Sequence, residues 1–177
     1  KTTRGYLPFD FLICSRTVPK IIQENGGQAI KTKVGHALIK PLMKKHKAVF
    51  GGEHSGHFYY RDNFYADSAL ITLVVFLELL SQENKKVSEL VKEIDRYYRS
   101  GELNSKVEGI PKKLQQIEKV YSSGKIDHLD GLTVEFDNWW FNLRPSNTEP
   151  LLRLNVEADS PQLLQQKTKE LLDLVRG

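Results

Sequence analysis

The sequence predicts an α/β protein: a partial three-layer α/β domain with a mixed, largely parallel sheet, followed by a small α+β domain with an antiparallel sheet. Two observations support this fold class. Short apolar runs alternate with helix-like segments through the first part of the chain, as in a helix-covered parallel sheet. Later the pattern changes to strand, turn and strand with period-two alternation. The length of 177 residues suits two small domains, which we place at 1–98 and 99–177.

In the first domain, we expect short strands wherever brief apolar runs are bounded by turn residues. These strands are Tyr6–Cys14, Gln28–Lys33, Ala48–Phe50 and Phe58–Tyr60. Ser15-Arg16-Thr17 is expected to cap a helix that stops at Asn25-Gly26-Gly27. A second helix is expected after the turn Val34-Gly35-His36, running to about Lys45. Pro41 within it predicts a kink or a late start.

Two further helices complete the first domain. Asp67 is expected to cap the helix Ser68–Ser81, which is nearly all apolar and is therefore expected to be buried. Apolar residues at helical spacing then predict an amphipathic helix over Val87–Tyr98.

The second domain is expected to combine two helices with a meander of strands. Pro111 starts a helix to about Ser122, with inward-facing residues Leu114, Ile117, Val120 and Tyr121. Leu132, Val134 and Phe136 alternate with polar residues as in a half-buried strand, and Asp137-Asn138 is a plausible two-residue turn. The meander continues through Trp139–Leu143 and Leu151–Val156, and Ser160-Pro161 opens a final helix.

Composition narrows the class of protein. Hydrophobic residues make up 40% and charged residues 27%, as in soluble globular proteins. The net charge of +4 suits anionic ligands, but the basic residues are scattered, so no nucleic-acid partner is expected. The longest apolar stretch, Ala66–Leu80, is too short and interrupted to span a membrane. The lone Cys14 excludes an intrachain disulfide and favours the cytoplasm.

The stretch Arg144-Pro145-Ser146-Asn147-Thr148-Glu149-Pro150 lies between two strand-like runs. A guanidinium fits a phosphate bidentately, and the hydroxyl, amide and backbone N–H groups can satisfy the other oxygens. Ser, Asn and Pro are also ordinary turn residues. The residues alone favour an anion site and a plain turn about equally.

A second motif, Gly51-Gly52-Glu53-His54-Ser55-Gly56-His57, offers groups suited to a sugar. A carboxylate accepts hydrogen bonds from adjacent hydroxyls, and a serine hydroxyl both donates and accepts. A hairpin connection with solvated polar groups is the favoured reading from the residues alone. A metal site at Glu53, His54 and His57 is not expected. The order of these residues does not match His-Glu-x-x-His, and no third ligand beside the two histidines is evident.

The two motifs together resemble the α-D-phosphohexomutase family, of the phosphomannomutase/phosphoglucomutase type. The Arg144 motif, followed by Leu-Leu-Arg-Leu-Asn-Val-Glu, resembles the phosphate-binding loop of the family's last domain, and the Glu53 motif resembles the sugar-binding loop of its third domain. The resemblance implies that Arg144, Ser146, Asn147 and Thr148 bind the distal phosphate. It also implies that Glu53 and Ser55 hold sugar hydroxyls and that His57 is a catalytic residue for positioning or proton transfer. His36 would contribute to the sugar pocket; a capping or surface histidine is nearly as well supported.

Other positions depart from the family's pattern. Ile13 stands where many relatives carry a ligand-contacting lysine, with Arg16 or Lys33 as possible substitutes, and His54 leaves the sugar's identity open. Asn147 leans toward the phosphomannomutase branch. The family's phosphoserine loop and Asp-rich magnesium loop are not found, so Mg²⁺ would be bound outside this chain.

The chain begins with Lys1 and reads as a C-terminal portion, the latter part of domain three plus domain four. The resemblance implies a full-length enzyme that interconverts hexose 1-phosphate and hexose 6-phosphate through a bisphosphorylated sugar. The isolated portion is expected to be inactive. The expected partners are a phosphorylated hexose and the missing N-terminal domains, with an edge-paired or swapped dimer of the fragment as a further expectation. The alternatives are a non-catalytic phosphosugar-binding module and a phosphoglucosamine mutase.

Overall fold

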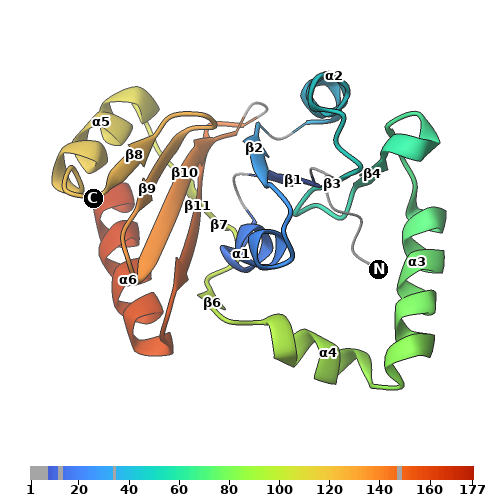
Figure 1. Ribbon diagram of the computed structural model, residues 1–177. Helices are drawn as coiled ribbons and strands as arrows, with labels where there is room; N and C mark the ends of the chain where they lie inside the picture. The colour runs from blue at the N-terminus through green and yellow to red at the C-terminus, as the bar shows by residue number, and fades with distance from the viewer. Residues whose placement is uncertain (1–7, 12–13, 34, 147–148) are drawn as a thin grey trace. The chain divides into compact units, whose positions relative to one another are not determined.

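The computed structural model describes residues 8–11, 14–33, 35–146 and 149–177, with the backbone alone for 8–11. The chain folds into two compact units, Lys1–Arg96 and Tyr97–Gly177 (Figure 1). The first carries a mixed sheet with helices, and the second carries an antiparallel sheet with helices. The predicted fold class is therefore confirmed.

The sheet of the first unit has five strands in the order β2-β1-β3-β4-β5. Its strands are β1 Pro8–Phe11, β2 Ile30–Thr32, β3 Phe50–Gly52, β4 Phe58–Tyr60 and β5 Ala66–Asp67. Strand β1 pairs in parallel with β2 and β3, whereas β4 is antiparallel to both β3 and β5. A 3₁₀ turn, Arg61–Asn63, connects β4 to β5. The parallel and antiparallel parts meet at β3, whose last residue directly precedes Glu53.

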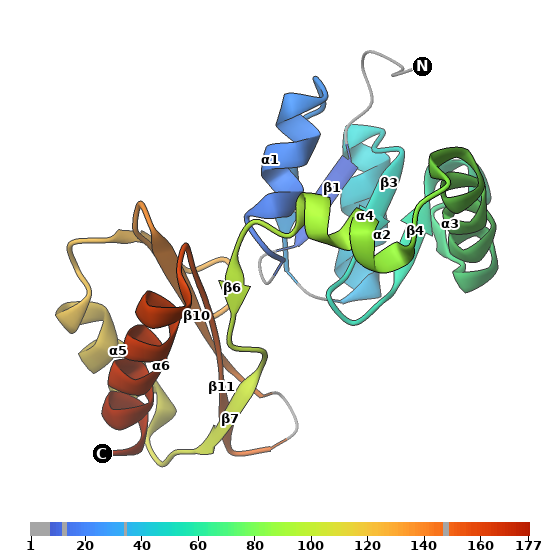
Figure 2. The same ribbon diagram turned by 90° about the horizontal axis from the view of Figure 1, so that it is seen from below.

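Two helices connect the parallel strands. Helix α1, Thr17–Glu24, links β1 to β2, and helix α2, His36–His46, links β2 to β3. Because the two connections run in opposite directions across the sheet and parallel crossovers are right-handed, the helices belong on opposite faces. Figure 2 shows α1 and α2 on either side of β1.

The boundaries of several of these elements differ from the prediction. The expected late start at Pro41 is wrong, because α2 begins at His36 and continues past the proline. The strand expected at Ala48–Phe50 lies two residues later, because Lys47 turns into the left-handed region and the Ala48 N–H closes the helix on Met43. Of the strand expected at Tyr6–Cys14, Pro8–Phe11 is confirmed, and residues 6, 7, 12 and 13 lie outside the described residues.

Helix α3, Ala69–Glu83, forms as expected but is capped and exposed differently. Its N-cap is Ser68, whose hydroxyl accepts the Ile71 N–H at 3.2 Å, so the predicted cap at Asp67 is wrong. Its predicted burial is also wrong, since no residue of α3 is buried and Leu70 is 76% exposed. The described part of the chain leaves this apolar helix uncovered, although its sequence suits a helix packed on all sides.

Helix α4, Val87–Ile94, ends four residues before the predicted Tyr98. The chain leaves helical geometry at Asp95, and Tyr98 and Arg99 form strand β6. Tyr98 pairs with Ala158 in the second unit's sheet, so strand pairing overrides the helical spacing of the tyrosines.

The sheet of the second unit is antiparallel, in the order β6-β11-β10-β9-β8, with β7 also pairing with β11. Its remaining strands are β7 Leu103–Lys106, β8 Lys125–Asp127, β9 Leu132–Glu135, β10 Trp139–Pro145 and β11 Leu151–Ala158. The chain reverses between β9 and β10 at Asp137-Asn138, where the Phe136 N–H donates to the Trp139 carbonyl at 2.9 Å. The predicted meander is confirmed, whereas β6, β7 and β8 were not predicted.

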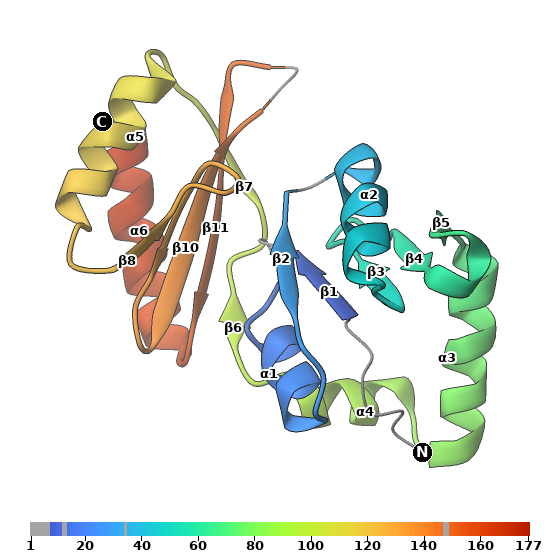
Figure 3. The same cartoon turned by 45° about the horizontal axis from the view of Figure 1, so that its top comes forward.

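Helices α5, Ile110–Val120, and α6, Pro161–Arg176, cover one face of this sheet (Figure 3). Between them and the strands lies a core of buried side chains that includes Ile117, Phe141 and Leu171. Ser160 caps α6 by accepting the Leu163 N–H at 3.2 Å, as predicted. Val120, expected to face inward, is 55% exposed because α5 ends there.

Candidate functional site

The Glu53 motif forms the turn between β3 and β4. The Glu53 N–H donates to the His57 carbonyl at 2.8 Å, and the Gly56 N–H donates to the Glu53 carbonyl at 2.9 Å. Gly56 has a φ of 87°, which an L side chain rarely adopts, so glycine suits this position. At Gly51, an added Cβ would lie 3.0 Å from the Met43 sulfur, so this glycine lets α2 pack closely on β3. The backbone conformation therefore sets the positions from which the polar side chains of the turn extend.

Within the turn, the Glu53 carboxylate is largely buried and already oriented. Its Oε1 accepts a hydrogen bond of 2.6 Å from the Tyr59 hydroxyl, and its Oε2 accepts a longer one of 3.3 Å from Ser55. Burial, together with the bond to Glu53, raises the pKa of Tyr59, so the phenol stays protonated and donates. Because each carboxylate oxygen has two lone pairs, both can still accept a hydroxyl from a ligand.

His57 ends the motif, and its ring is hydrogen-bonded to Asp67 of β5. The His57 Nδ1 and the Asp67 Oδ2 are 2.7 Å apart, and the Asp67 Oδ1 accepts the Phe58 N–H at 3.0 Å. The hydrogen bond to Asp67 raises the pKa of His57, and the nearby charge of Glu53 adds to this effect. The same hydrogen bond lowers the pKa of Asp67. The imidazole therefore gains a proton more readily than a free histidine does.

These side chains surround one pocket of about 270 Å³, which lies wholly within the first unit. The pocket is lined by the three predicted sugar-binding residues, His36, Glu53 and Ser55, together with the predicted catalytic residue His57. The remaining lining residues are Gly35, Lys40, Tyr59 and Asp67. Residues from α2, from the β3–β4 turn and from β5 thus meet around a space sized for a small polar molecule.

Sequence reasoning missed three of the pocket residues. Lys40 follows His36 by one helical turn and therefore shares its helix face, which the sequence does reveal once α2 is known to start at His36. Tyr59 looked like part of an apolar strand, and Asp67 looked like a helix cap. Their roles depend on strand pairing, because Tyr59 and Asp67 lie directly opposite each other on β4 and β5.

The Arg144 motif bridges β10 and β11 in the second unit. Arg144 and Pro145 are the last residues of β10, and the Ser146 N–H donates to the Leu151 carbonyl at 2.8 Å. Of the predicted phosphate-binding residues, Arg144 and Ser146 are described, whereas Asn147 and Thr148 lie outside the described residues. Arg144 is therefore held by the β10 strand, and Ser146 is held by its hydrogen bond to Leu151.

A second arginine, which the sequence reasoning did not single out, lies next to Arg144. Arg153 is directly opposite Arg144 in the β10–β11 register, so the two side chains share one face of the sheet. Arg153 Nη2 donates to the Ser146 hydroxyl at 3.4 Å. Glu102 lies between the guanidiniums, 3.6 Å from Arg144 Nη2 and 3.5 Å from Arg153 Nη1. Two positive charges with one carboxylate leave this cluster with a formal excess of positive charge.

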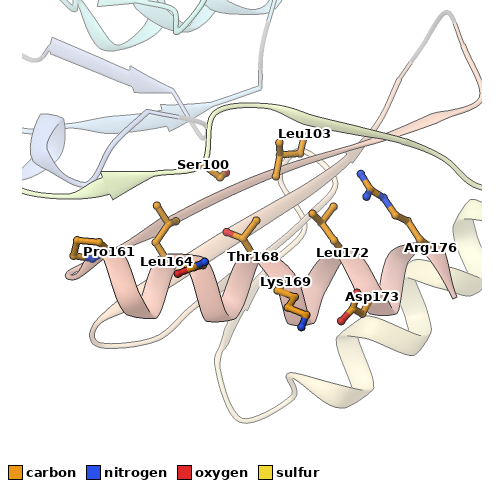
Figure 4. A pocket seen from close by; sticks show the side chains of 10 residues that line it. Ser100, Leu103, Pro161, Leu164, Thr168, Lys169, Leu172, Asp173 and Arg176 are labelled. Atoms are coloured by element: carbon orange, nitrogen blue, oxygen red, sulfur yellow. The ribbon is translucent and has the colours of Figure 1, made fainter.

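A second cavity, of about 610 Å³, lies along α6 (Figure 4). Leu164, Thr168 and Leu172 of the helix line it, together with Leu103 of β7. None of the residues predicted for the sugar or phosphate lines this groove.

Neither a metal-binding cluster nor a membrane-spanning helix occurs among the residues that the structure describes. In 8–11, 14–33, 35–146 and 149–177, no group of three or more His, Cys, Asp or Glu side chains could hold a metal ion. No helix in the described part of the chain has the length and apolar character needed to cross a membrane. We therefore assign no magnesium ligand to these residues.

Comparison with known proteins identifies both units. Residues 11–97 match the family described as phosphoglucomutase/phosphomannomutase, alpha/beta/alpha domain III, and residues 102–174 match the phosphoglucomutase/phosphomannomutase C-terminal domain. The chain is 45% identical over 164 residues to a phosphomannomutase of Methanocaldococcus jannaschii, covering 93% of this chain and 36% of the relative. It is 40% identical over 160 residues to a phosphomannomutase of Escherichia coli, covering 88% of this chain and 35% of the relative.

A solved structure of a phosphoglucomutase/phosphomannomutase family protein from Burkholderia thailandensis matches with a TM-score of 0.81 and 27% identity. The match covers 97% of this chain and 37% of that protein. The chain therefore spans about a third of the length of these relatives and corresponds to their C-terminal part. On this evidence, the chain belongs to the phosphoglucomutase/phosphomannomutase family.

Proposed function

We propose that this chain is the sugar-binding and distal-phosphate-binding part of a phosphomannomutase or phosphoglucomutase. The full-length protein would interconvert hexose 1-phosphate and hexose 6-phosphate through a bisphosphorylated sugar. The observation that carries the proposal is the pocket in the first unit, where His36, Glu53, Ser55 and His57 gather. The family resemblance assigns His36, Glu53 and Ser55 to the sugar and His57 to catalysis, and His36 comes from a different part of the sequence than the other three.

In this proposal, Glu53 accepts hydrogen bonds from two adjacent sugar hydroxyls. Tyr59 and Ser55 hold one carboxylate oxygen each, so the carboxylate is oriented before the sugar arrives. Preorganisation of this kind reduces the entropy lost on binding. Lys40, which also lines the pocket, supplies an ammonium group for a ligand oxygen. His57 exchanges a proton with the hydroxyl that takes part in phosphoryl transfer.

The distal phosphate is assigned to Arg144, Ser146, Asn147 and Thr148. The positive cluster of Arg144 and Arg153, balanced by the single carboxylate of Glu102, supports an anion at this end of the sheet. The phosphoserine and the magnesium ligands would be supplied by the rest of the full-length protein. Residues 1–177 alone are therefore expected to bind the ligand without turning it over, and the cytoplasm remains the predicted compartment.

The experiment that tests the proposal follows backbone amide shifts of residues 1–177 during titration with mannose 6-phosphate, mannose and inorganic phosphate. We expect phosphate to shift amides near Arg144–Glu149 and the phosphosugar to shift Glu53–His57 as well. Adding glucosamine 6-phosphate separates the phosphoglucosamine mutase alternative, which predicts preferential binding of that sugar. If neither loop responds to any phosphorylated ligand, the assignment of these residues as the binding site fails.

The role of Arg144 is tested in the full-length protein. Replacing Arg144 with Ala removes a charge-assisted contact worth about 1.5–3 kcal/mol, so phosphosugar affinity should fall roughly 10- to 150-fold. The matched control is Arg176→Ala, an arginine of the same unit whose Nε bonds to Ser105 instead. Unchanged Michaelis constant and turnover in Arg144→Ala would remove this residue from the site.

A non-catalytic phosphosugar-binding module is the second candidate function. It uses the same pocket and the same arginines, and it predicts binding by the full-length protein without any isomerisation of the sugar phosphate. An edge-paired dimer of residues 1–177 also stays a prediction; β2 and β5 are the two outer strands of the first sheet.

A further inference from the structure

Asp67 is held in place from two sides. It lies in β5, next to β4, and its Oδ1 accepts the N–H of Phe58 at 3.0 Å. The residue after it, Ser68, donates its N–H to the Phe58 carbonyl at 3.0 Å and caps α3. The carboxylate is therefore anchored to the backbone of the strand that begins one residue after His57, and its Oδ2 is left for the imidazole at 2.7 Å.

This contact selects one form of the imidazole. An ionised carboxylate only accepts hydrogen bonds, so Nδ1 must be the donor. In the neutral ring, the proton then resides on Nδ1, and Nε2 carries the lone pair. This contact would be lost if Asp67 instead capped α3, as its sequence position suggests.

We propose that Asp67 is a positioning residue that fixes His57 as the Nδ1–H tautomer and leaves Nε2 as the atom that takes up a proton. This inference deepens the proposed function, and the catalytic role of Asp67 rests on that function. When a sugar hydroxyl attacks a phosphoryl group of the full-length protein, the O–H proton passes to Nε2. The hydroxyl oxygen bonds to phosphorus, and the donor oxygen leaves with the electron pair of the broken P–O bond. The imidazolium formed is stabilised by the Asp67 carboxylate.

The other charged and titratable groups around the pocket do not replace Asp67. Glu53 lines the same pocket, but its carboxylate is oriented by Tyr59 and Ser55, whereas the His57 Nδ1 is bonded to Asp67. His36 and Lys40 of α2 are basic and cannot accept a proton from His57 when charged. Asp67 is therefore the carboxylate in direct contact with the His57 ring.

The test is a pH titration of the ring nitrogen shifts of His57 in labelled residues 1–177, with no ligand added. The wild type is expected to show protonated Nδ1 in the neutral form and a pKa above the ordinary value of about 6.5. Asp67→Asn removes the charge and should lower the His57 pKa, whereas Asp67→Ala should also release the tautomer preference. Asp67→Glu should restore part of the effect.

Asp62→Asn is the matched control, since Asp62 pairs with Arg61 at 2.8 Å rather than with a histidine. It should leave His57 unchanged. A wild-type ring protonated on Nε2, or an unchanged pKa in Asp67→Asn with native amide shifts, would overturn the proposal. Because no phosphosugar is present, this outcome is distinct from a failure of the binding titration.

In the full-length protein, Asp67→Asn should lower kcat by roughly 10-fold or more, as part of the about 10²–10⁴-fold that proton transfer contributes. KM should change little, and the acid limb of the kcat profile, which reports the pKa of the base, should move to lower pH with the His57 pKa. A loss confined to KM would mean that Asp67 acts on binding and not through His57.

Discussion

The buried hydrogen bond between Tyr59 and Glu53 allows a sharp test of the sugar pocket. Tyr59→Phe removes one oxygen atom and leaves the ring, which is 1% exposed, in place. The lost bond is 2.6 Å long and joins a neutral donor to a carboxylate that is 8% exposed. Hydrogen bonds to charged groups contribute about 1.5–3 kcal/mol. The remaining partner, Ser55, is at 3.3 Å and compensates only weakly.

The matched control is Tyr60→Phe on the same strand. The Tyr60 hydroxyl bonds to the neutral Thr72 hydroxyl at 2.8 Å, and a neutral pair contributes about 0.5–1.5 kcal/mol. Tyr59→Phe should therefore destabilise the first unit more than Tyr60→Phe does, although both remove the same atom type. The difference isolates the charge of Glu53.

Amide hydrogen exchange reports the effect for the first unit alone, because the slowest amides of β3 and β4 exchange through its unfolding. A loss of about 1.5–3 kcal/mol should speed their exchange by roughly 10- to 150-fold. The phosphosugar titration should weaken in parallel, since Glu53 loses its orientation. If Tyr59→Phe costs no more than Tyr60→Phe, the carboxylate is not held as described, and the preorganised sugar site is refuted.

Three further predictions follow from other contacts. Arg153→Gln should weaken inorganic phosphate binding in the amide titration by roughly 10-fold, and unchanged binding would remove Arg153 from the anion site. Because the interaction raises the pKa of His57, its contribution to stability is complete below about pH 6.5 and is lost as pH rises through the folded pKa of His57. Because the interaction lowers the pKa of Asp67, its contribution through Asp67 is present above about pH 3.9 and is lost as pH falls through the folded pKa of Asp67. The melting temperature difference between wild type and Asp67→Asn should therefore peak near pH 5–6 and shrink by pH 9; a difference independent of pH would contradict the ion pair. Leu70→Lys with Val74→Lys should reduce apolar dye binding and self-association of residues 1–177, because both side chains are exposed on α3; a wild type that binds no dye would contradict an open apolar face.

The sequence was a sound guide where the decisive physics is local. The strand β4, the helices α1, α5 and α6, and the turn at Asp137-Asn138 follow from short-range periodicity, capping and turn chemistry. The Glu53 motif forms a hairpin turn, because glycine at positive φ and the hairpin hydrogen bonds are properties of a few adjacent residues.

Predictions from local patterns were wrong where contacts between residues far apart in the sequence determined the structure. Tyr98 has helical spacing with the residues before it, yet it pairs with Ala158 and becomes part of a strand. The apolar pattern of α3 predicts a covered helix, but a helix can be buried only if other segments lie against it, and the described chain leaves Leu70 76% exposed.

By itself, the sequence determined the α/β class, the order of most elements and the two motifs that mark the family. The tertiary structure alone decided which side chains meet. Pairing of β4 with β5 brings Asp67 to His57, the start of α2 at His36 brings Lys40 to the pocket, and the β10–β11 register sets Arg153 opposite Arg144. The physical reason is that propensity depends on neighbours in the chain, whereas hydrogen-bond and ion-pair partners depend on strand register and helix boundaries, which are fixed when the whole unit packs.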